Sequence, residues 1–246
     1  MTTFTAKSVV VDCADNYGNS LMCIRSIEFH LSGSLIPVTS GFVAYGTSRY
    51  NQDYSYEMIF NTSLSKTGVW QYTSWVSNNA STNQRVIIVF DTPITFDEIV
   101  VNNGHSDGTV TDSGAKNVKI QISDDAISNV TYNAAVSNSY LLFDGIFDQH
   151  VAANIADDKT LSLIPPPYKV SGTVTVNGSP AARTVAVFLR DGFTLLGTTT
   201  SNATTGAFEL NNWHLSSSTD ALLVTAIDST GDYNAVSVDY ITAVAI

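Results

Sequence analysis

Histidines and acidic residues are the side chains of this chain that could do acid–base or metal chemistry. The histidines are scattered, and none has another at metal-ligand spacing. The acidic residues form adjacent pairs, and neighbouring residues of a strand point to opposite faces of its sheet. No nucleophile elbow is recognisable. We therefore expect a non-enzymatic protein without a metal site or cofactor. The residues concerned are His30, His105, His150 and His214, and the pairs Asp97-Glu98, Asp124-Asp125 and Asp157-Asp158.

Two further groups allow more than one interpretation. Cys13 and Cys23 are the only cysteines, and they could face each other across a hairpin or be two small buried residues. We favour burial. Asp15, Asn16 and Asn19 lie in an oxygen-rich turn that could hold Ca²⁺, although their spacing is not that of an EF-hand.

An aromatic stretch is the strongest candidate for ligand binding. From Arg49 to Tyr54 the sequence alternates rings with hydrogen-bonding groups, within an irregular region at 41–84. Ring faces stack on apolar C–H patches of sugars, and polar groups recognise their hydroxyls. The same mixture occurs at protein interfaces. Trp75 is expected in the core. The candidate ligand-binding residues are Arg49, Tyr50, Asp53 and Tyr54, together with His105 and Asp107 from a second polar loop.

Composition and charge restrict the partners. The 246 residues carry a net charge of −11, and only 13% are charged, about half the usual share. No cluster of Lys and Arg is present, so we expect no nucleic-acid binding. No apolar run approaches the roughly 20 residues of a membrane-spanning helix. The N-terminus lacks the features of a signal peptide, so export by the ordinary route is not expected.

Short apolar and alternating runs predict β-strands throughout the first part of the chain. Val118, Ile120 and Ile122 alternate with polar residues, as in a strand with one buried face. Val86–Phe90 is apolar on both faces, which predicts a central strand. The expected strands are Thr5–Val11, Met22–Leu31, Val86–Phe90, Glu98–Val101, Asn117–Ser123, Tyr140–Gly145 and a closing strand at Leu161–Leu163.

Three consecutive prolines mark the clearest boundary. Pro165–Pro167 cannot donate backbone hydrogen bonds and favour a stiff, extended spacer. After them, residues 168–246 contain at least six strand-like runs with hairpin signals at Asn177-Gly178 and Asp191-Gly192. We predict an all-β protein of two β-sandwich domains, at 1–164 and 168–246, joined by the linker 165–167.

The first predicted domain resembles the discoidin (coagulation factor 5/8 type C) or galactose-binding-like jelly roll. The resemblance rests on Thr73–Ser77, QRVIIVFD at 84–91 and NVKIQISDD at 117–125, and covers roughly residues 5–163. It implies a jelly roll with a possible lipid- or glycan-binding role. Discoidin domains commonly join their ends by a disulfide, whereas both cysteines here lie near the N-terminus.

The second predicted domain resembles transthyretin-like or carboxypeptidase-regulatory-like domains with an immunoglobulin-type sandwich. The resemblance rests on SGTVTVNGSPAARTVAVF at 171–188, Thr205-Gly206 and Tyr233–Ala235. These motifs are also similar to a small domain appended to bacteriophage virion proteins. The paired resemblance implies a structural protein of a phage particle.

Several functional hypotheses follow. The leading one is a bacteriophage virion protein of the tail or baseplate that makes assembly contacts, attaches to host-surface glycans, or does both. Its partners would be other virion proteins and copies of itself, with no membrane insertion. The alternatives are a capsid decoration protein, a carbohydrate-binding or adhesion module of a bacterial surface protein, and an accessory subunit of a hydrolase.

Overall fold

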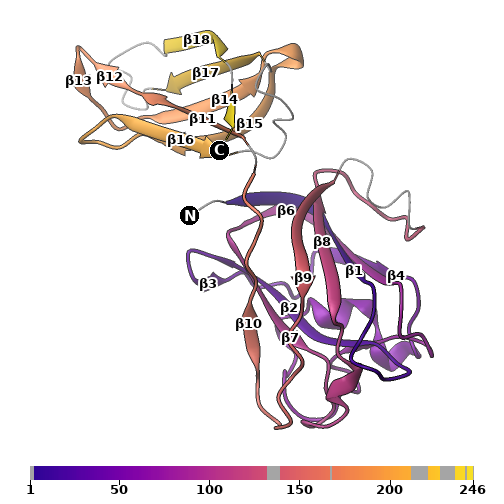
Figure 1. Cartoon of the computed structure of the whole chain (residues 1–246). Coiled ribbons are helices and arrows are strands. Elements are labelled where there is room, and N and C mark those ends of the chain that lie inside the picture. Colours follow the sequence, from indigo (N-terminus) through magenta and orange to yellow (C-terminus); the bar gives the residue numbers. More distant parts are fainter. Residues whose placement is uncertain are drawn as a thin grey trace. The chain divides into compact units, whose positions relative to one another are not determined.

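The computed structural model of the chain shows an all-β protein (Figure 1). It describes residues 3–131, 139–166, 168–211, 221–227, 236–241 and 243–245. The chain divides into two compact units, Met1–Ile164 and Pro165–Ile246. Three features discussed above, Pro167, His214 and Tyr233–Ala235, lie outside the described residues.

The first unit contains two antiparallel sheets. The five-stranded sheet has the order β4 (Phe42–Gly46), β6 (Gln84–Phe96), β1 (Phe4–Cys13), β8 (Asn117–Ser123) and β9 (Tyr140–Ile146). The second sheet has the order β10 (Asp158–Thr160), β7 (Glu98–Asn103), β2 (Cys23–Leu31) and β3 (Ser34–Leu35), and β5 (Trp75–Val76) pairs with β2. Non-consecutive strands are therefore neighbours, so residues far apart in sequence share one face.

Aromatic rings fill the space between these sheets. Phe29 of β2 contacts Phe90 and Phe96 of β6, at ring-centroid distances of 5.7 and 5.1 Å. All three side chains are at most 3% exposed. Aromatic pairs of this kind contribute about 0.5–1.5 kcal/mol each beyond the area that they bury.

The structure confirms most of the expected strands of this unit. In β8 the side chains of Val118, Ile120 and Ile122 are buried, whereas Lys119 is exposed. Both faces of Val86–Phe90 in β6 are buried, and Ile87 and Val89 pack with Ile127 in a cluster of their own, which explains why this run is apolar on both faces.

Two expectations need correction. The closing strand is Asp158–Thr160, which pairs with β7, and Leu161–Leu163 follows it outside any ladder. The sequence Asp-Lys-Thr has no apolar alternation, so the pattern favoured the leucines beside it. The irregular region at 41–84 also begins with strand β4, whose Ala44 alone is buried. An exposed edge strand lacks the periodic signal on which the prediction relied.

The second unit has one sheet of order β16 (Ala207–Asn211), β11 (Tyr168–Thr173) and β19 (Val244–Ala245). Another sheet has the order β15 (Thr194–Thr200), β14 (Thr184–Leu189), β17 (Leu222–Ile227) and β18 (Val236–Ile241). Val170 of the first sheet packs with Val185 and Val187 of the second. This confirms a β-sandwich.

Both hairpin signals of this unit are confirmed. Asn177 and Gly178 have φ of 51° and 81°, and they join β12 (Thr175–Val176) to β13 (Ser179–Pro180). Left-handed backbone at both central positions is the geometry of a type I′ turn. Gly192, with φ of 75°, lies in the short turn η4 (Asp191–Phe193) between β14 and β15.

Candidate functional site

The loop between β4 and β5, residues 47–74, carries four of the six predicted site residues. Its start is fixed to the sandwich by backbone and core contacts. Trp75 is fully buried, as predicted, and its indole N–H donates to the carbonyl of Ser48 at 2.8 Å. The N–H of Tyr50 donates to the carbonyl of Val76, also at 2.8 Å. The ring of Tyr50 is therefore carried on a backbone that is held in place.

A short 3-10 turn, η1 (Gln52–Tyr54), organises the next residues. The Asn51 side chain accepts from the N–H of Asp53 at 2.7 Å and caps the turn. The Asp53 carboxylate accepts from the Gln71 side-chain amide at 3.0 Å, and the Asp53 carbonyl accepts from the N–H of Tyr72 at 2.8 Å. The segment around Gln71, which lies 18 positions after Asp53 in the chain, is therefore hydrogen-bonded to the turn.

These contacts bring the rings of Tyr50, Tyr54 and Trp70 together, and Tyr72 is tied to the same turn by its backbone; we call these four residues the aromatic surface. The Tyr50 and Tyr54 rings meet edge-to-face at a centroid distance of 5.7 Å, and Tyr54 and Trp70 do so at 6.3 Å. Tyr50 is 51% exposed and Tyr72 is 58% exposed, whereas Tyr54 and Trp70 are half-buried. Edge-to-face packing fixes the rings and leaves ring area open to solvent.

The aromatic surface has polar groups at its edge. The Asp53 carboxylate has acceptor capacity beyond its bond to Gln71, and phenol hydroxyls both donate and accept. An exposed ring next to oriented hydrogen-bonding groups fits a sugar, which has apolar and hydroxyl-bearing faces. Trp70, Gln71 and Tyr72 were not among the predicted site residues. Their contacts with η1 are tertiary, so only the Trp-Gln-Tyr composition could have indicated them.

Arg49 points its charge at a neighbouring ring. Its guanidinium carbon lies 5.6 Å from the centroid of the Tyr56 ring, within the range of a cation–π interaction. Tyr56 begins a second 3-10 turn, η2 (Tyr56–Ile59), and its ring covers Gly46. A Cβ at Gly46 would lie 2.2 Å from the Tyr56 ring, so this position requires glycine.

The structure separates the two remaining predicted residues. Asp107 is exposed, with φ of 52°, and its N–H donates to the carbonyl of Gly68 at 2.8 Å. His105 is fully buried. Its Nδ1 accepts from the N–H of Gly108 at 3.1 Å, so Nε2 carries the proton and donates to the Lys66 carbonyl at 3.0 Å. The placement of His105 in a polar loop suggested accessibility, but the side chain points inward and supports the loops.

The imidazole of His105 stacks on that of His150. The rings of His105 and His150 are 3.7 Å apart between centroids and 21° from parallel, and both are buried. Burial, followed by the neighbouring His150, lowers the pKa of His105 to about 4. The guanidinium of Arg25, also buried, donates to the carbonyls of His105 and Thr67. Arg25 lies at an irregularity between Ile24 and Ser26 of β2, where a bulge turns its side chain to the loops.

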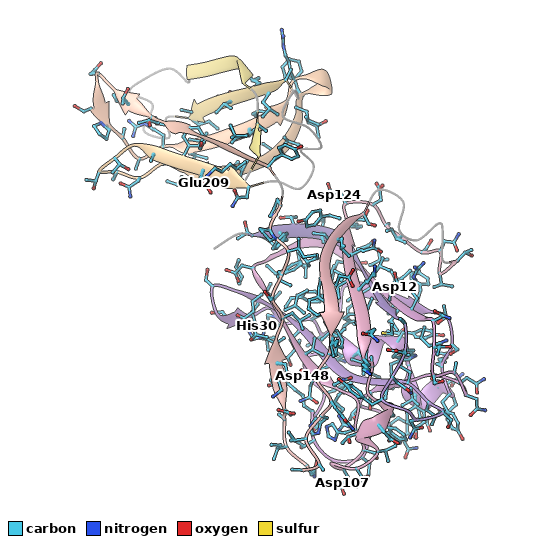
Figure 2. All side chains as sticks on the ribbon, in the orientation of Figure 1. Asp12, His30, Asp107, Asp124, Asp148 and Glu209 are labelled. Carbon is cyan, nitrogen blue, oxygen red and sulfur yellow. The ribbon has the colours of Figure 1, made fainter. Side chains whose placement is uncertain are left out.

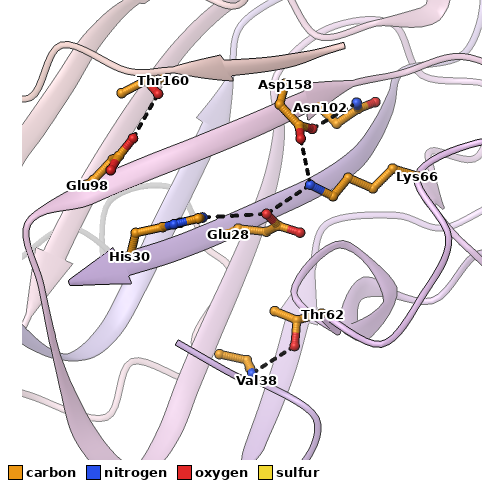
Figure 3. Close-up of polar contacts among 9 residues, drawn as sticks. All are labelled: Glu28, His30, Val38, Thr62, Lys66, Glu98, Asn102, Asp158 and Thr160. Carbon is orange, nitrogen blue, oxygen red and sulfur yellow. Dashed lines mark hydrogen bonds and ion pairs between the residues drawn. The ribbon is translucent and has the colours of Figure 1, made fainter. Parts of the chain in front are cut away.

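Lys66 connects the long loop to the second sheet (Figure 3). Its ammonium group lies 2.9 Å from a Glu28 carboxylate oxygen and 2.8 Å from an Asp158 oxygen. His30, also on β2, lies 3.6 Å from the same oxygen of Glu28. With its carbonyl bonded to His105, Lys66 holds the second half of the loop on the sandwich.

The other candidate groups have structural partners. Asp97 accepts from the N–H of Ser32, and Asp157 from the N–H of Val151 at 3.1 Å. The Asp15 carboxylate accepts from the Asn117 amide at 2.9 Å. Among the described residues, no group of three or more His, Cys, Asp or Glu side chains is arranged to hold a metal ion.

The two cysteines are free and buried, which confirms their interpretation as small core residues. Burial raises the pKa of both thiols, that of Cys23 to about 12. Neither thiol is therefore a reactive thiolate at neutral pH.

The comparisons with known proteins add no family: no protein-family model and no curated protein matches this chain. Within the described parts of the chain, no helix is both long and apolar enough to cross a membrane.

Proposed function

We propose that this chain is a non-enzymatic bacteriophage virion protein of the tail or baseplate that attaches to host-surface glycans through the aromatic surface. The observation that carries this proposal is the ring arrangement itself. Tyr50 and Tyr72 are each more than half exposed, and Tyr54 holds Tyr50 edge-on. A ligand that covers these rings gains the free energy of removing their apolar area from water.

The fold gives this proposal its support on the structural side. The two-sheet sandwich of the first unit is compatible with the discoidin or galactose-binding-like jelly roll, and the second unit with a transthyretin-like or immunoglobulin-type sandwich. The motifs at 171–188 and Thr205-Gly206 resemble those of a domain appended to phage virion proteins. We propose both family assignments on these motifs. Because one fold hosts many functions, the site carries the functional part of the argument.

The partners proposed for this role are other virion proteins, further copies of this chain and a neutral or weakly charged glycan. A net charge of −11 disfavours strongly acidic polysaccharides, since like charges repel at close range. Arg49, the one cationic side chain in the predicted site, is placed against Tyr56. Stacking and hydroxyl recognition would therefore supply most of the affinity.

Attachment is tested with Tyr50→Ala and Tyr54→Ala in the full chain, using fluorescent protein and cells of the host strain. We expect each variant to bind cells several-fold more weakly while it keeps its unfolding transition. The matched control is Phe193→Ala, because Phe193 is an exposed ring (68%) in the other unit. Unchanged binding of both tyrosine variants would contradict the role of the aromatic surface.

The particle context needs a separate test, immunogold electron microscopy of phage particles with an antibody to this chain. Label on the tail or baseplate would support the proposal. Label spread over the head would indicate a decoration protein instead. Unlabelled particles would contradict the virion assignment and favour a binding module of a bacterial surface protein.

A further inference from the structure

Part of the outer face of the five-stranded sheet carries a second apolar layer. There, Ile127 packs on Val10, Ile87 and Val89, and Val130 adds to this small core. The side chains of these strand residues point away from the main core, so the segment around Ile127 forms a second apolar layer on the sheet.

A cavity of about 520 Å³ lies next to Val130 of this layer. Strands β1, β6, β8 and β9 all contribute to its lining, together with Thr47, Asn83 and Val130. We call this cavity the groove. Its volume lies within the roughly 300–1,000 Å³ that is typical of small-molecule sites. It is distinct from the aromatic surface, with which it shares no residue.

Four charged side chains form a row of alternating sign across the groove. The strand register places Asp12 opposite both Arg85 and Lys119, and Lys119 opposite Asp144. Asp12 accepts two hydrogen bonds from the Arg85 guanidinium, one from Nη2 at 2.9 Å and one from Nε. Lys119 and Asp144 are paired at 3.0 Å.

The two ion pairs differ in accessibility. The Arg85 side chain is 2% exposed and that of Asp12 is 16% exposed, so this pair is a fixed part of the wall. Lys119 and Asp144 are 57% and 48% exposed, so this pair is accessible to a ligand from solvent. Asp12 is labelled on the sheet in Figure 2, well away from Asp107 at the loop end of the unit.

Neutral groups complete the lining. Asn83 is part of the lining, and Ile146, which is 56% exposed, adds an apolar wall together with Val130. The row of charges is balanced, two positive against two negative, so it attracts neither an anion nor a cation strongly. It does present alternating donors and acceptors beside apolar surface. This combination matches a ligand with many hydroxyls, no net charge and an apolar face.

We propose that the groove is a second binding site and that it takes a neutral, polyhydroxylated ligand of one or two sugar units. Lys119 donates to ligand hydroxyls and Asp144 accepts from them, while Ile146 covers the apolar face of the ring. The buried Asp12–Arg85 pair keeps the two inner strands in register beneath the ligand. This site requires no contribution from the aromatic surface.

The test uses saturation-transfer NMR and calorimetric titration of the full chain with glucose, galactose, N-acetylglucosamine, lactose and cellobiose. Three variants are compared with the wild type. The double variant Lys119→Ala/Asp144→Ala removes the exposed ion pair from the groove. Lys169→Ala with Glu209→Ala removes a comparable exposed pair, 2.9 Å apart, from the second unit. Tyr50→Ala reports on the aromatic surface.

We expect at least one of these sugars to bind at millimolar concentration and the groove variant to lose about tenfold in affinity, as for lost hydrogen bonds to charged groups. The Lys169/Glu209 control and Tyr50→Ala should bind that sugar as the wild type does. The inference is overturned if none of the sugars binds, or if the groove variant binds normally. Loss of binding in Tyr50→Ala alone would also overturn it, while supporting the proposed role of the aromatic surface. A further titration compares glucuronate with glucose, and preference for glucuronate would contradict the neutral class.

Discussion

The aromatic surface and the groove are built in opposite ways. All four rings of the aromatic surface come from one loop, between Tyr50 and Tyr72. The groove takes its charges from four strands, with Asp12 and Asp144 at opposite ends of the unit's sequence. A site on one loop leaves a local pattern in the sequence, whereas a site on a sheet face depends on strand order.

The two regions should also respond differently to substitution. The aromatic surface lies on a loop attached to the sandwich, whereas the groove is lined by strands of the sandwich itself. Substitution of the Asp12–Arg85 pair beneath the groove should reduce stability, whereas substitution of an exposed ring of the aromatic surface should reduce binding alone.

The largest effect is expected for Asp12→Ala. It leaves the Arg85 guanidinium, 2% exposed, without its carboxylate, and breaking such a buried pair costs about 3–5 kcal/mol of unfolding free energy. Urea denaturation measures this change. The control is Asp144→Ala, which breaks an exposed pair and should cost less than about 1 kcal/mol. Equal losses in the two variants would show that the Asp12–Arg85 pair is not a fixed part of the wall.

Acidification should weaken the loop end of the unit through His105. Its folded-state pKa, about 4, lies below the value of 6.5 that an unperturbed histidine has. The unfolded chain therefore takes up the proton first, so this stability is complete above pH 6.5 and is lost as the pH falls toward 4. At about 1.4 kcal/mol per pH unit, the loss at pH 5 is about 2 kcal/mol.

The pH dependence can be assigned by comparing unfolding of the wild type and His105→Gln at a series of pH values. The difference between their unfolding free energies should shrink as the pH falls from 7 to 5. A constant difference would mean that His105 does not resist protonation in the folded state.

Gly46→Ala should disturb the support of the aromatic surface. A Cβ there would meet the Tyr56 ring at 2.2 Å, so η2 must shift, at a cost of about 1–3 kcal/mol. Thermal unfolding would report the change. Gly33→Ala is a useful comparison, because its Cβ meets no atom within 4 Å, although its φ of 76° adds backbone strain. An unchanged melting temperature of Gly46→Ala would contradict the packing described for this turn.

The smallest effect on stability is expected for Tyr50→Ala. Its ring is 51% exposed, and surface substitutions of this kind change the unfolding free energy by less than about 0.5 kcal/mol. Thermal and urea unfolding should therefore coincide with those of the wild type. A clear loss of stability would mean that Tyr50 is a structural residue rather than a binding one.

Much of the fold could be predicted from the sequence because its strands carry a clear period. Alternating burial in β8 and the apolar run of β6 follow directly from Val118, Ile120 and Val86–Phe90. The closing strand β10 was misplaced because its pairing with β7 depends on backbone contacts and not on apolar side chains. Strand β4 was missed for the same reason.

The site could be predicted only where it is local. The sequence indicated Tyr50, Asp53 and Tyr54, which the structure gathers at one turn. It could not show that His105 points inward against His150, which lies 45 positions further along the chain. Nor could it place Lys119 beside Asp144, because that contact depends on the register of β8 and β9.

The measurement that tests the central claim most directly is binding of the labelled full chain to an array of bacterial surface glycans, with Tyr50→Ala measured in parallel. We predict a defined set of neutral glycans that the wild type binds and that Tyr50→Ala binds several-fold more weakly, with no change in unfolding. An array on which the wild type binds nothing, or on which both proteins bind the same glycans equally well, would contradict glycan attachment through the aromatic surface.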